Sequence, residues 1–256
     1  MKLALLSDIH SNRQALDACL QHARNHGAEH FALLGDLVGY GADPAYVVQQ
    51  AMELAAAGHS VIGGNHDAFA VHPPVGADKG ATSIAAQGAV WTHEQLTPQQ
   101  RDFLAQLPLT AEVGGVLLVH ASADAPESWR YVDNEVVAAQ CLEAATQHPG
   151  VQHVFCGHVH LQTLYYRGAG RGLMRFTPMA GVAVPVPPHR QWVATVGSVG
   201  QPRDGDPRAM YALLDTDHWQ LRFERVPYAV SEAATAILAT GGALPPTFAH
   251  RLEIGR

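Results

Sequence analysis

The chain has 256 residues, of which 47% are hydrophobic and 15% are charged, and it carries 16 Lys and Arg against 23 Asp and Glu. A chain of this length and composition can bury a full core without disulfides, which argues against a disordered, collagen-like or coiled-coil protein. The net charge of −7 argues against a protein that binds long nucleic acid through bulk electrostatics. It does not exclude an enzyme whose positive charge comes from bound metal ions.

The cysteines are few and form no Cys-x-x-Cys motif; they are Cys19, Cys141 and Cys156. This usage is typical of reduced, buried thiols in a cytoplasmic protein. The apolar run at residues 3–6 is too short for the core of a signal peptide, and no apolar stretch approaches the length of a membrane span. We therefore expect a cytoplasmic protein that does not enter a membrane.

The first part of the chain alternates short apolar runs with helix signals. Three apolar runs predict buried strands: residues 3–6, 31–34 and 61–62. Ser11 or Asn12 can cap a helix that runs to about residue 26 and ends at Gly27. Asp43 and Pro44 are typical of a helix start, and this second helix runs to about residue 57. Strands that alternate with helices in this way predict a layered α/β fold.

The alternation of strands and helices continues through the middle of the chain, and after His160 the sequence predicts mainly hairpins and strands. Residues 81–107 are helical in character, with a helix start at Thr97 and Pro98, and a helix at 135–145 separates strands at 115–119 and 151–155. Later elements are also predicted: hairpins at 165–172 and 192–200, a loop insertion with four prolines at 178–189, a strand pair at 210–215 and 221–226, and a helix at 231–239. We expect a single domain over residues 1–256, with a C-terminal helix and tail at about 229–256.

Five short motifs fall at or just beyond the C-terminal ends of predicted strands. They are Asp8-Ile9-His10, Gly35-Asp36, Gly64-Asn65-His66-Asp67, His120 and Gly157-His158-Val159-His160. Open α/β sheets bind their ligands at these strand ends. Carboxylates, a carboxamide and imidazoles are the donors of a mixed oxygen and nitrogen metal site. The motifs therefore predict a metal centre at one edge of the fold.

The number of donors points to more than one ion. Three residues offer oxygen and four offer imidazole nitrogen: Asp8, Asp36 and Asn65, and His10, His120, His158 and His160. Seven ligands exceed the needs of one ion, but they suit two ions if one carboxylate bridges them. Two ions about 3.5–4 Å apart form the arrangement that clamps phosphoryl oxygens in hydrolases.

In their order along the chain, the five motifs resemble the pattern of the calcineurin-like metallophosphoesterase superfamily, and in particular its small single-domain prokaryotic branch. The stretches at 7–12, 35–41 and 197–205 are also similar to that branch. The resemblance implies an α/β (α+β) fold, a four-layer α/β/β/α sandwich of two mixed β-sheets flanked by helices. It also implies two divalent or trivalent metal ions, with Mn, Fe and Zn as candidates.

The resemblance assigns a role to each motif residue. Asp8, His10 and His160 would bind the first metal, Asn65, His120 and His158 the second, and Asp36 both. A metal-bridging hydroxide would then attack phosphorus in line. His66, which lies beside a ligand, is the candidate proton donor to the leaving group, with Asp67 orienting or charging its ring. Arg203, on a glycine-rich loop, is a candidate contact for a substrate oxygen.

Simpler interpretations of several residues stay open at this point. His66 could be a histidine that only supports the site, and Arg203 could form an ordinary surface salt bridge. The segment 129–131, Trp-Arg-Tyr, could line a cleft, but we expect a packed loop; for Tyr40 no sequence feature decides between cleft and packing. We expect Cys156 in the core, and we expect the histidines outside the five motifs to be solvated.

The predicted function is hydrolysis of phosphodiesters or small phosphorylated metabolites by a dinuclear metal-dependent phosphoesterase. A phosphomonoesterase, including a protein phosphatase, is the alternative among enzymes, because the metals and His66 would serve both. A non-catalytic scaffold on the same fold is the alternative from another class. The expected partner is a small-molecule phosphoester, not a membrane or long nucleic acid, and no sequence feature indicates an oligomeric state.

Overall fold

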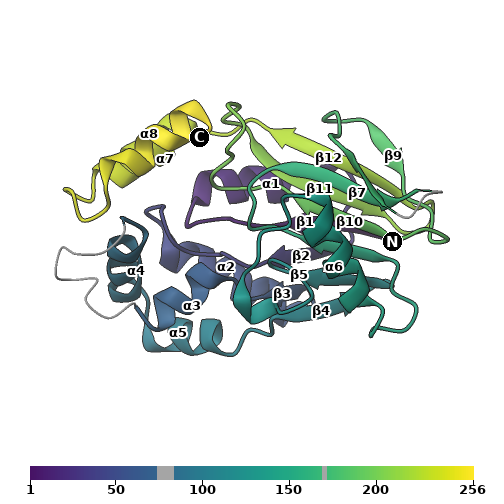
Figure 1. The fold of residues 1–256 in the computed structure, drawn as a ribbon. Helices are drawn as coiled ribbons and strands as arrows, with labels where there is room; N and C mark the ends of the chain where they lie inside the picture. The colour runs from purple at the N-terminus through teal and green to yellow at the C-terminus, as the bar shows by residue number, and fades with distance from the viewer. Residues whose placement is uncertain (74–83, 169–171) are drawn as a thin grey trace.

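The computed structural model describes residues 1–73, 84–168 and 172–256, and its strands form two six-stranded sheets (Figure 1). The strands of the first sheet are β1 (Lys2–Leu6), β2 (His30–Leu34), β3 (Ser60–Ile62), β9 (Ala183–Pro185), β11 (Ala209–Asp215) and β12 (Gln220–Val226), in the order β3-β2-β1-β11-β12-β9. The strands of the second sheet are β4 (Thr110–Val113), β5 (Val116–Val119), β6 (His153–Cys156), β7 (Gln162–Arg167), β8 (Leu173–Phe176) and β10 (Trp192–Val196), in the order β4-β5-β6-β10-β7-β8. Both sheets are mixed, because β1–β2 and β5–β6 pair in parallel whereas β1–β11 and β10–β7 pair antiparallel.

Helices cover the outer faces of the two sheets (Figure 1). The described helices are α1 (Arg13–Asn25), α2 (Pro44–Ala56), α3 (Asn65–Val71), α4 (Ile84–Gln95), α5 (Pro98–Ala105), α6 (Glu135–Ala145), α7 (Val230–Leu238) and α8 (Pro246–Ile254), with a 3₁₀ turn at Pro126–Ser128. Side chains of α1, α2 and α5 pack with the first sheet, and side chains of α6 pack with the second. The four-layer α/β/β/α sandwich predicted from the resemblance is confirmed.

The central strands are apolar throughout because both of their faces are covered. In β1, Leu3 and Leu5 belong to the cluster between the sheets, whereas Ala4 and Leu6 belong to the cluster under the helices. Successive side chains of a strand point to opposite faces, so a strand that is buried on both sides needs a continuous apolar run. This burial holds the ends of β1 and its neighbours rigidly at one edge of the fold.

Local sequence signals locate most helix ends correctly. Asn12 caps α1, its side chain accepting a hydrogen bond from the Ala15 amide at 3.1 Å, and Thr97 caps α5 in the same way. Asp43 occupies the position before α2, but its side chain makes no capping hydrogen bond. The predicted helix at 135–145 coincides with α6, and the strand pair predicted at 210–215 and 221–226 is the antiparallel pair of β11 and β12.

Two predicted elements are wrong. Residues 192–200 do not form a hairpin, because β10 is a central strand between β6 and β7 and a loop follows it. The insertion at 178–189 is not only a loop, because β9 pairs antiparallel with β12 at the edge of the first sheet. Pro185 has no amide hydrogen to donate, and an edge strand tolerates this because no further strand pairs with its outer side.

Other elements were not predicted or are only partly described. The sequence prediction missed α3, β4 and α8. The β7–β8 pair confirms part of the hairpin predicted at 165–172. Residues 81–83 of the predicted helical region and 169–171 of that hairpin lie outside the described residues.

His153 is a further correction, since it is not solvated. Its side chain is only 1% exposed and lies between the sheets, where its ring stacks on Trp219 with 4.4 Å between centroids. Its Nε2 donates a hydrogen bond to the Val186 carbonyl at 2.7 Å. The side chain faces inward because it shares the face of β6 that carries Phe155.

Cys19, Cys141 and Cys156 are buried free thiols, as predicted. Among the described residues, no helix has both the length and the apolar character needed to cross a membrane.

Candidate metal centre

All five motifs lie just beyond the C-terminal ends of strands: four are in loops, and residues 65–67 form the first turn of α3, which follows β3. Asp8 follows β1 and Asp36 follows β2 in the first sheet, while His120 follows β5 and His158 follows β6 in the second. Backbone hydrogen bonds join these loops: the Asp8 amide donates to the Gly35 carbonyl at 3.1 Å, and the Gly157 amide donates to the His120 carbonyl at 2.9 Å. The His158 amide also donates to Asp8 Oδ2 at 2.9 Å, which joins the loops of the two sheets at one shared site.

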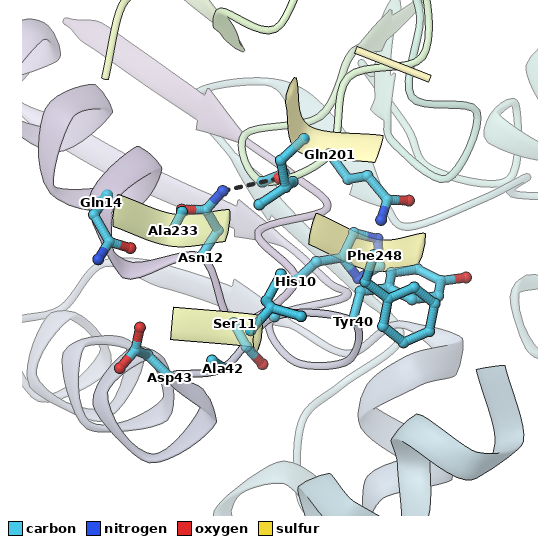
Figure 2. A pocket seen from close by; sticks show the side chains of 14 residues that line it. His10, Ser11, Asn12, Gln14, Tyr40, Ala42, Asp43, Gln201, Ala233 and Phe248 are labelled. Carbon is cyan, nitrogen blue, oxygen red and sulfur yellow. Dashed lines mark hydrogen bonds between the residues drawn. The ribbon is translucent and has the colours of Figure 1, made fainter. Parts of the chain in front are cut away.

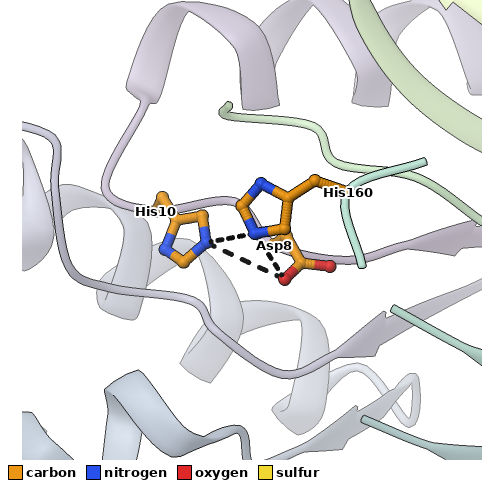
Figure 3. Close-up of side chains that lie close together, drawn as sticks. All are labelled: Asp8, His10 and His160. Carbon is orange, nitrogen blue, oxygen red and sulfur yellow. Dashed lines mark hydrogen bonds and ion pairs between the residues drawn. The ribbon is translucent and has the colours of Figure 1, made fainter. Parts of the chain in front are cut away.

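The first group of side chains consists of Asp8, His10 and His160, all buried (Figure 3). The Nε2 atoms of His10 and His160 are 3.1 Å apart, and Asp8 Oδ1 lies 3.1 Å from His160 Nε2 and 3.8 Å from His10 Nε2. The three ligand atoms lie within 4.8 Å of one another. A single cation can contact all three.

The second group consists of Asp36, His120 and His158, also buried and also within 4.8 Å. Asp36 Oδ2 lies 3.3 Å from His120 Nε2, and that nitrogen lies 3.2 Å from His158 Nδ1. The same Asp36 oxygen lies 3.8 Å from His10 Nε2 of the first group. The Asp36 carboxylate thus lies between the two groups, which are drawn from both sheets.

Hydrogen bonds fix the orientation of three of the imidazoles. The Nδ1 atoms of His10, His120 and His160 donate to the carbonyls of Val38, Leu34 and Gln201 at 3.1, 2.8 and 2.6 Å respectively. A ring that donates from Nδ1 presents the lone pair of Nε2, and the Nε2 atoms are those that converge on the two groups. Backbone carbonyls that hold imidazoles in this way are typical of metal-ligating histidines.

Buried oxygen atoms without partners provide a test of whether cations fit here. Asp8 Oδ2 accepts a hydrogen bond from the His158 amide and Asp36 Oδ1 accepts one from the His66 amide, at 2.9 and 2.8 Å. Asp8 Oδ1 and the Asn65 carboxamide oxygen are buried and accept none. An unpaired buried oxygen is costly unless something else binds it. Oxygen and nitrogen donors of this kind suit Mn, Fe or Zn, so the residues present fit a metal pair.

Electrostatics within the cluster favour the protonation states that metal ligands need at Asp36, His10 and His158, but not at His120. Burial works against the charge on Asp36, but His120 and His66 outweigh it and hold the pKa of Asp36 well below its usual range. Burial lowers the pKa of His10 strongly and that of His158 to about 4, so both rings are neutral at pH 7. Burial also opposes charge on His120, but Asp36 raises its pKa to about 9, so a bound cation would displace one proton there.

The backbone of the candidate ligands is strained. Non-glycine residues rarely adopt positive φ, and each instance costs about 1 kcal/mol or more. Five of the seven candidate ligands adopt it: Asp8 at 53°, His10 at 50°, Asp36 at 51°, His158 at 65° and His160 at 61°. Gly35 before Asp36 also has positive φ, and a Cβ there would lie 2.7 Å from the Gly64 amide nitrogen. The loops around the site are therefore held in place by the surrounding fold.

His66 lies at the start of α3 with its ring beside the first group. Its ring centroid is 4.5 Å from that of Tyr40 and 5.0 Å from that of His10, and burial lowers its pKa. The role predicted for Asp67 stays a prediction: among the described residues, its carboxylate has two other hydrogen-bond partners. It accepts hydrogen bonds from the amides of Gly64 and Val38 at 2.9 and 3.2 Å, as a carboxylate in the first turn of a helix commonly does.

Arg203 is half-buried near the first group. Its Nη2 donates to Gln201 Oε1 at 3.1 Å, and the Gln201 carbonyl is the group that holds His160. Arg203 forms no ion pair with any described carboxylate, and the neighbouring Asp204 pairs with Arg225 instead. The surface salt bridge considered for Arg203 is therefore not observed in the described part of the chain.

Two aromatic residues contact the centre: Tyr40, which the sequence left undecided, and Tyr131, which we expected in a packed loop. Tyr40, with φ of 61°, packs its ring against His10 at 4.6 Å as well as against His66. Tyr131 stacks on His158 at 4.0 Å and is half exposed, so it forms part of the wall around the site. The glycines at 39 and 41, which flank Tyr40, are the sequence signal that could have indicated a special backbone at this position.

Comparisons with known proteins agree with this geometry. The model of the calcineurin-like phosphoesterase superfamily domain matches residues 1–218. An uncharacterised protein of Methanocaldococcus jannaschii is 30% identical, over 99% of this chain and 98% of its own. A metallophosphoesterase from Sphaerobacter thermophilus superposes with a TM-score of 0.85 at 29% identity, with 100% of both chains covered. A hypothetical protein from Pyrococcus horikoshii shares the fold, with a TM-score of 0.75 at 20% identity over 100% of this chain and 98% of that one. The chain therefore belongs to the calcineurin-like phosphoesterase superfamily.

Proposed function

We propose that the protein is a dinuclear metal-dependent phosphoesterase that hydrolyses phosphodiesters or small phosphorylated metabolites. The position of Asp36 carries this proposal. Its Oδ2 lies 3.3 Å from a histidine nitrogen of one buried group and 3.8 Å from a histidine nitrogen of the other. A carboxylate in that position can ligate two cations at once, which is the arrangement that phosphoryl transfer uses.

The two ions would share the seven candidate ligands. Asp8, His10 and His160 would hold the first, Asn65, His120 and His158 the second, and Asp36 both. When bound, such a pair supplies Lewis acidity to the phosphoryl oxygens and lowers the pKa of water towards 7. Mn, Fe and Zn all suit the donor set.

His66 would protonate the leaving group. Its ring lies against that of His10, and among the described residues no carboxylate competes for its ring nitrogens. Burial disfavours its charged form, but a phosphoester anion beside the ring would favour the imidazolium that donates the proton. Asp67 would act indirectly, by fixing the N-terminus of α3 and with it His66.

Arg203 would bind a non-bridging phosphoryl oxygen. Its guanidinium is half-buried, lies beside the Tyr40 hydroxyl and has no carboxylate partner among the described residues. A guanidinium with free donors matches the geometry of phosphate oxygens.

The proposal is tested by stripping the protein with a chelator, restoring Mn²⁺ and measuring hydrolysis of bis-p-nitrophenyl phosphate and p-nitrophenyl phosphate. We expect metal-dependent turnover, with the diester preferred. Asp36→Asn should abolish it, whereas Asp102→Asn, which removes an exposed carboxylate of α5, should not. Faster hydrolysis of the monoester would favour a phosphomonoesterase instead. No turnover of either ester by protein that binds two metal ions would contradict hydrolysis of these esters and favour a scaffold.

A further inference from the structure

The C-terminal helices α7 and α8 pack beside the candidate metal centre and form their own apolar cluster (Figure 1). The buried members of this cluster are Ala233, Ala234, Ile237, Leu244, Phe248, Ala249 and Leu252. Tyr40 and Ala42, from the loop after β2, and Trp91, from α4, pack against it. The cavity between the helices and that loop measures about 10 Å³, room for about one water molecule, so the junction is closely packed.

Phe248 connects α8 to the centre through aromatic rings. It is 1% exposed, and its ring meets that of Tyr40 edge-on with 5.0 Å between centroids (Figure 2). The Tyr40 ring in turn lies 4.5 Å from that of His66 and 4.6 Å from that of His10. A continuous series of edge-on and tilted ring contacts therefore runs from α8 to His66. Among the described residues no side chain hydrogen-bonds the His66 ring, so packing is what orients it.

The end of α8 makes a second connection, to the loop that carries Arg203. The Gly205 amide donates to the Gly255 carbonyl at 2.8 Å. Gly255 has φ of 64°, and a Cβ there would lie 2.7 Å from the Asp206 backbone. Only a glycine fits so close to this loop without a shift. The loop is therefore fixed two residues after Arg203 by the last turn of the chain.

The two connections converge, because the Arg203 guanidinium lies beside the Tyr40 hydroxyl. We propose that the α7–α8 pair is a brace that positions Tyr40 and Arg203, so that Tyr40 orients His66 towards the leaving group and Arg203 meets a phosphoryl oxygen. Tyr40 is in this sense a positioning residue. The proposal rests on the proposed phosphoesterase function and assigns to these helices a part in it.

The first test uses aryl phosphodiesters whose leaving groups range from nitrophenol to phenol. A proton donor matters little for a good leaving group and much for a poor one. Tyr40→Leu, which removes the ring, should therefore lose little kcat on the nitrophenyl ester and on the order of 10-fold or more on the phenyl ester, following the trend of His66→Ala. Tyr40→Phe keeps the ring, so its kcat should depend on the leaving group as the kcat of the wild type does.

The control for this series is Tyr46→Phe, which removes a hydroxyl that hydrogen-bonds Asp17 on the surface of α1. It should behave as the wild type does. If Tyr40→Leu loses the same factor on every ester, the residue has only a structural role and the positioning of His66 is refuted.

The second test compares two glycines with nearly equal φ. Gly255→Ala places a methyl group against Asp206, whereas Gly241→Ala, at φ of 67°, meets nothing within 4 Å. The probe is inorganic phosphate, measured by calorimetry on the Mn²⁺-loaded protein. Gly255→Ala should weaken phosphate binding about 10-fold, as Arg203→Ala should, because one charge-assisted hydrogen bond is lost. Gly241→Ala should leave binding unchanged.

The outcomes separate this proposal from the proposed function. Phosphate binding that weakens in Arg203→Ala but not in Gly255→Ala refutes the brace, whatever the enzyme hydrolyses. A wild type that binds phosphate but turns over no ester refutes the proposed function and leaves the comparison of the two glycines valid. If Gly255→Ala does not fold, Phe248→Leu replaces it. This variant keeps an apolar side chain but removes the ring that contacts Tyr40, and an unchanged dependence of kcat on the leaving group would refute the brace.

Discussion

Acidification to pH 5 should destabilise the protein through His153. Burial lowers the pKa of this ring to about 4 in the folded protein, against 6.5 for an exposed histidine. The unfolded chain therefore takes up a proton below pH 6.5, while the folded chain takes it up only near pH 4. The contribution of neutral His153 to the free energy of unfolding is therefore complete above pH 6.5, and it is lost as the pH falls from 6.5 towards 4.

The size of the effect follows from the two pKa values. At pH 5 the unfolded chain is favoured by protonation about 30-fold relative to neutral pH, which is about 2 kcal/mol. With a urea dependence of about 3 kcal/mol per molar for a chain of this size, the unfolding midpoint should fall by about 0.7 M through this residue alone.

The assay compares urea unfolding of the wild type and His153→Gln at pH 7.5, 6 and 5, with chelator present so that metal binding does not contribute. Glutamine is neutral throughout and keeps a donor for the Val186 carbonyl. The difference between the two proteins in the free energy of unfolding should change by about 2 kcal/mol between pH 7.5 and 5. His189→Gln, at an exposed position, is the matched control and should track the wild type. Equal pH dependence of the wild type and His153→Gln would refute the reasoning.

Three further predictions concern the centre. His66→Ala should reduce turnover of esters with poor leaving groups by a factor on the order of 10² to 10⁴ with metal content intact, and loss of metal would instead make it a ligand. Asp36→Asn should reduce Mn²⁺ bound after dialysis below two equivalents per chain, measured by plasma mass spectrometry; two full equivalents would exclude a bridging role. Removing Mn²⁺ from protein that was saturated at 100 times the Kd should lower the melting temperature in calorimetry by about 6 °C for each occupied site, because each ligand group joins both sheets. An unchanged melting temperature would contradict that coupling.

Local patterns predicted the elements whose signals lie within a few residues. The cap at Asn12 and the apolar runs of β1 and β2 act through neighbouring residues, so their positions follow from sequence alone. The grouping of Asp8 with Asp36, and that of His120 with His158, was also predictable, because parallel strands of one sheet bring their C-terminal ends together.

Features that depend on distant partners were not predictable in this way. The run at β10 is the same whether it forms a hairpin or a central strand, and its pairing with β6 is a contact across some 40 residues. The Asp67 carboxylate accepts a hydrogen bond from the Val38 amide, 29 residues earlier, and no local pattern predicts that partner. The contact of Phe248 with Tyr40 joins segments about 200 residues apart, with no shared motif.

The place of β1 at the middle of the first sheet has a consequence for the order in which the chain is synthesised. One edge of β1 pairs with β2, made soon after it, but the other pairs with β11, which begins at Ala209. At a ribosomal rate of about 5–20 residues per second, that edge stays open for about 10–40 s. A nascent chain therefore exposes an apolar strand long before its partner leaves the ribosome, and this interval is when aggregation and chaperone binding compete with folding.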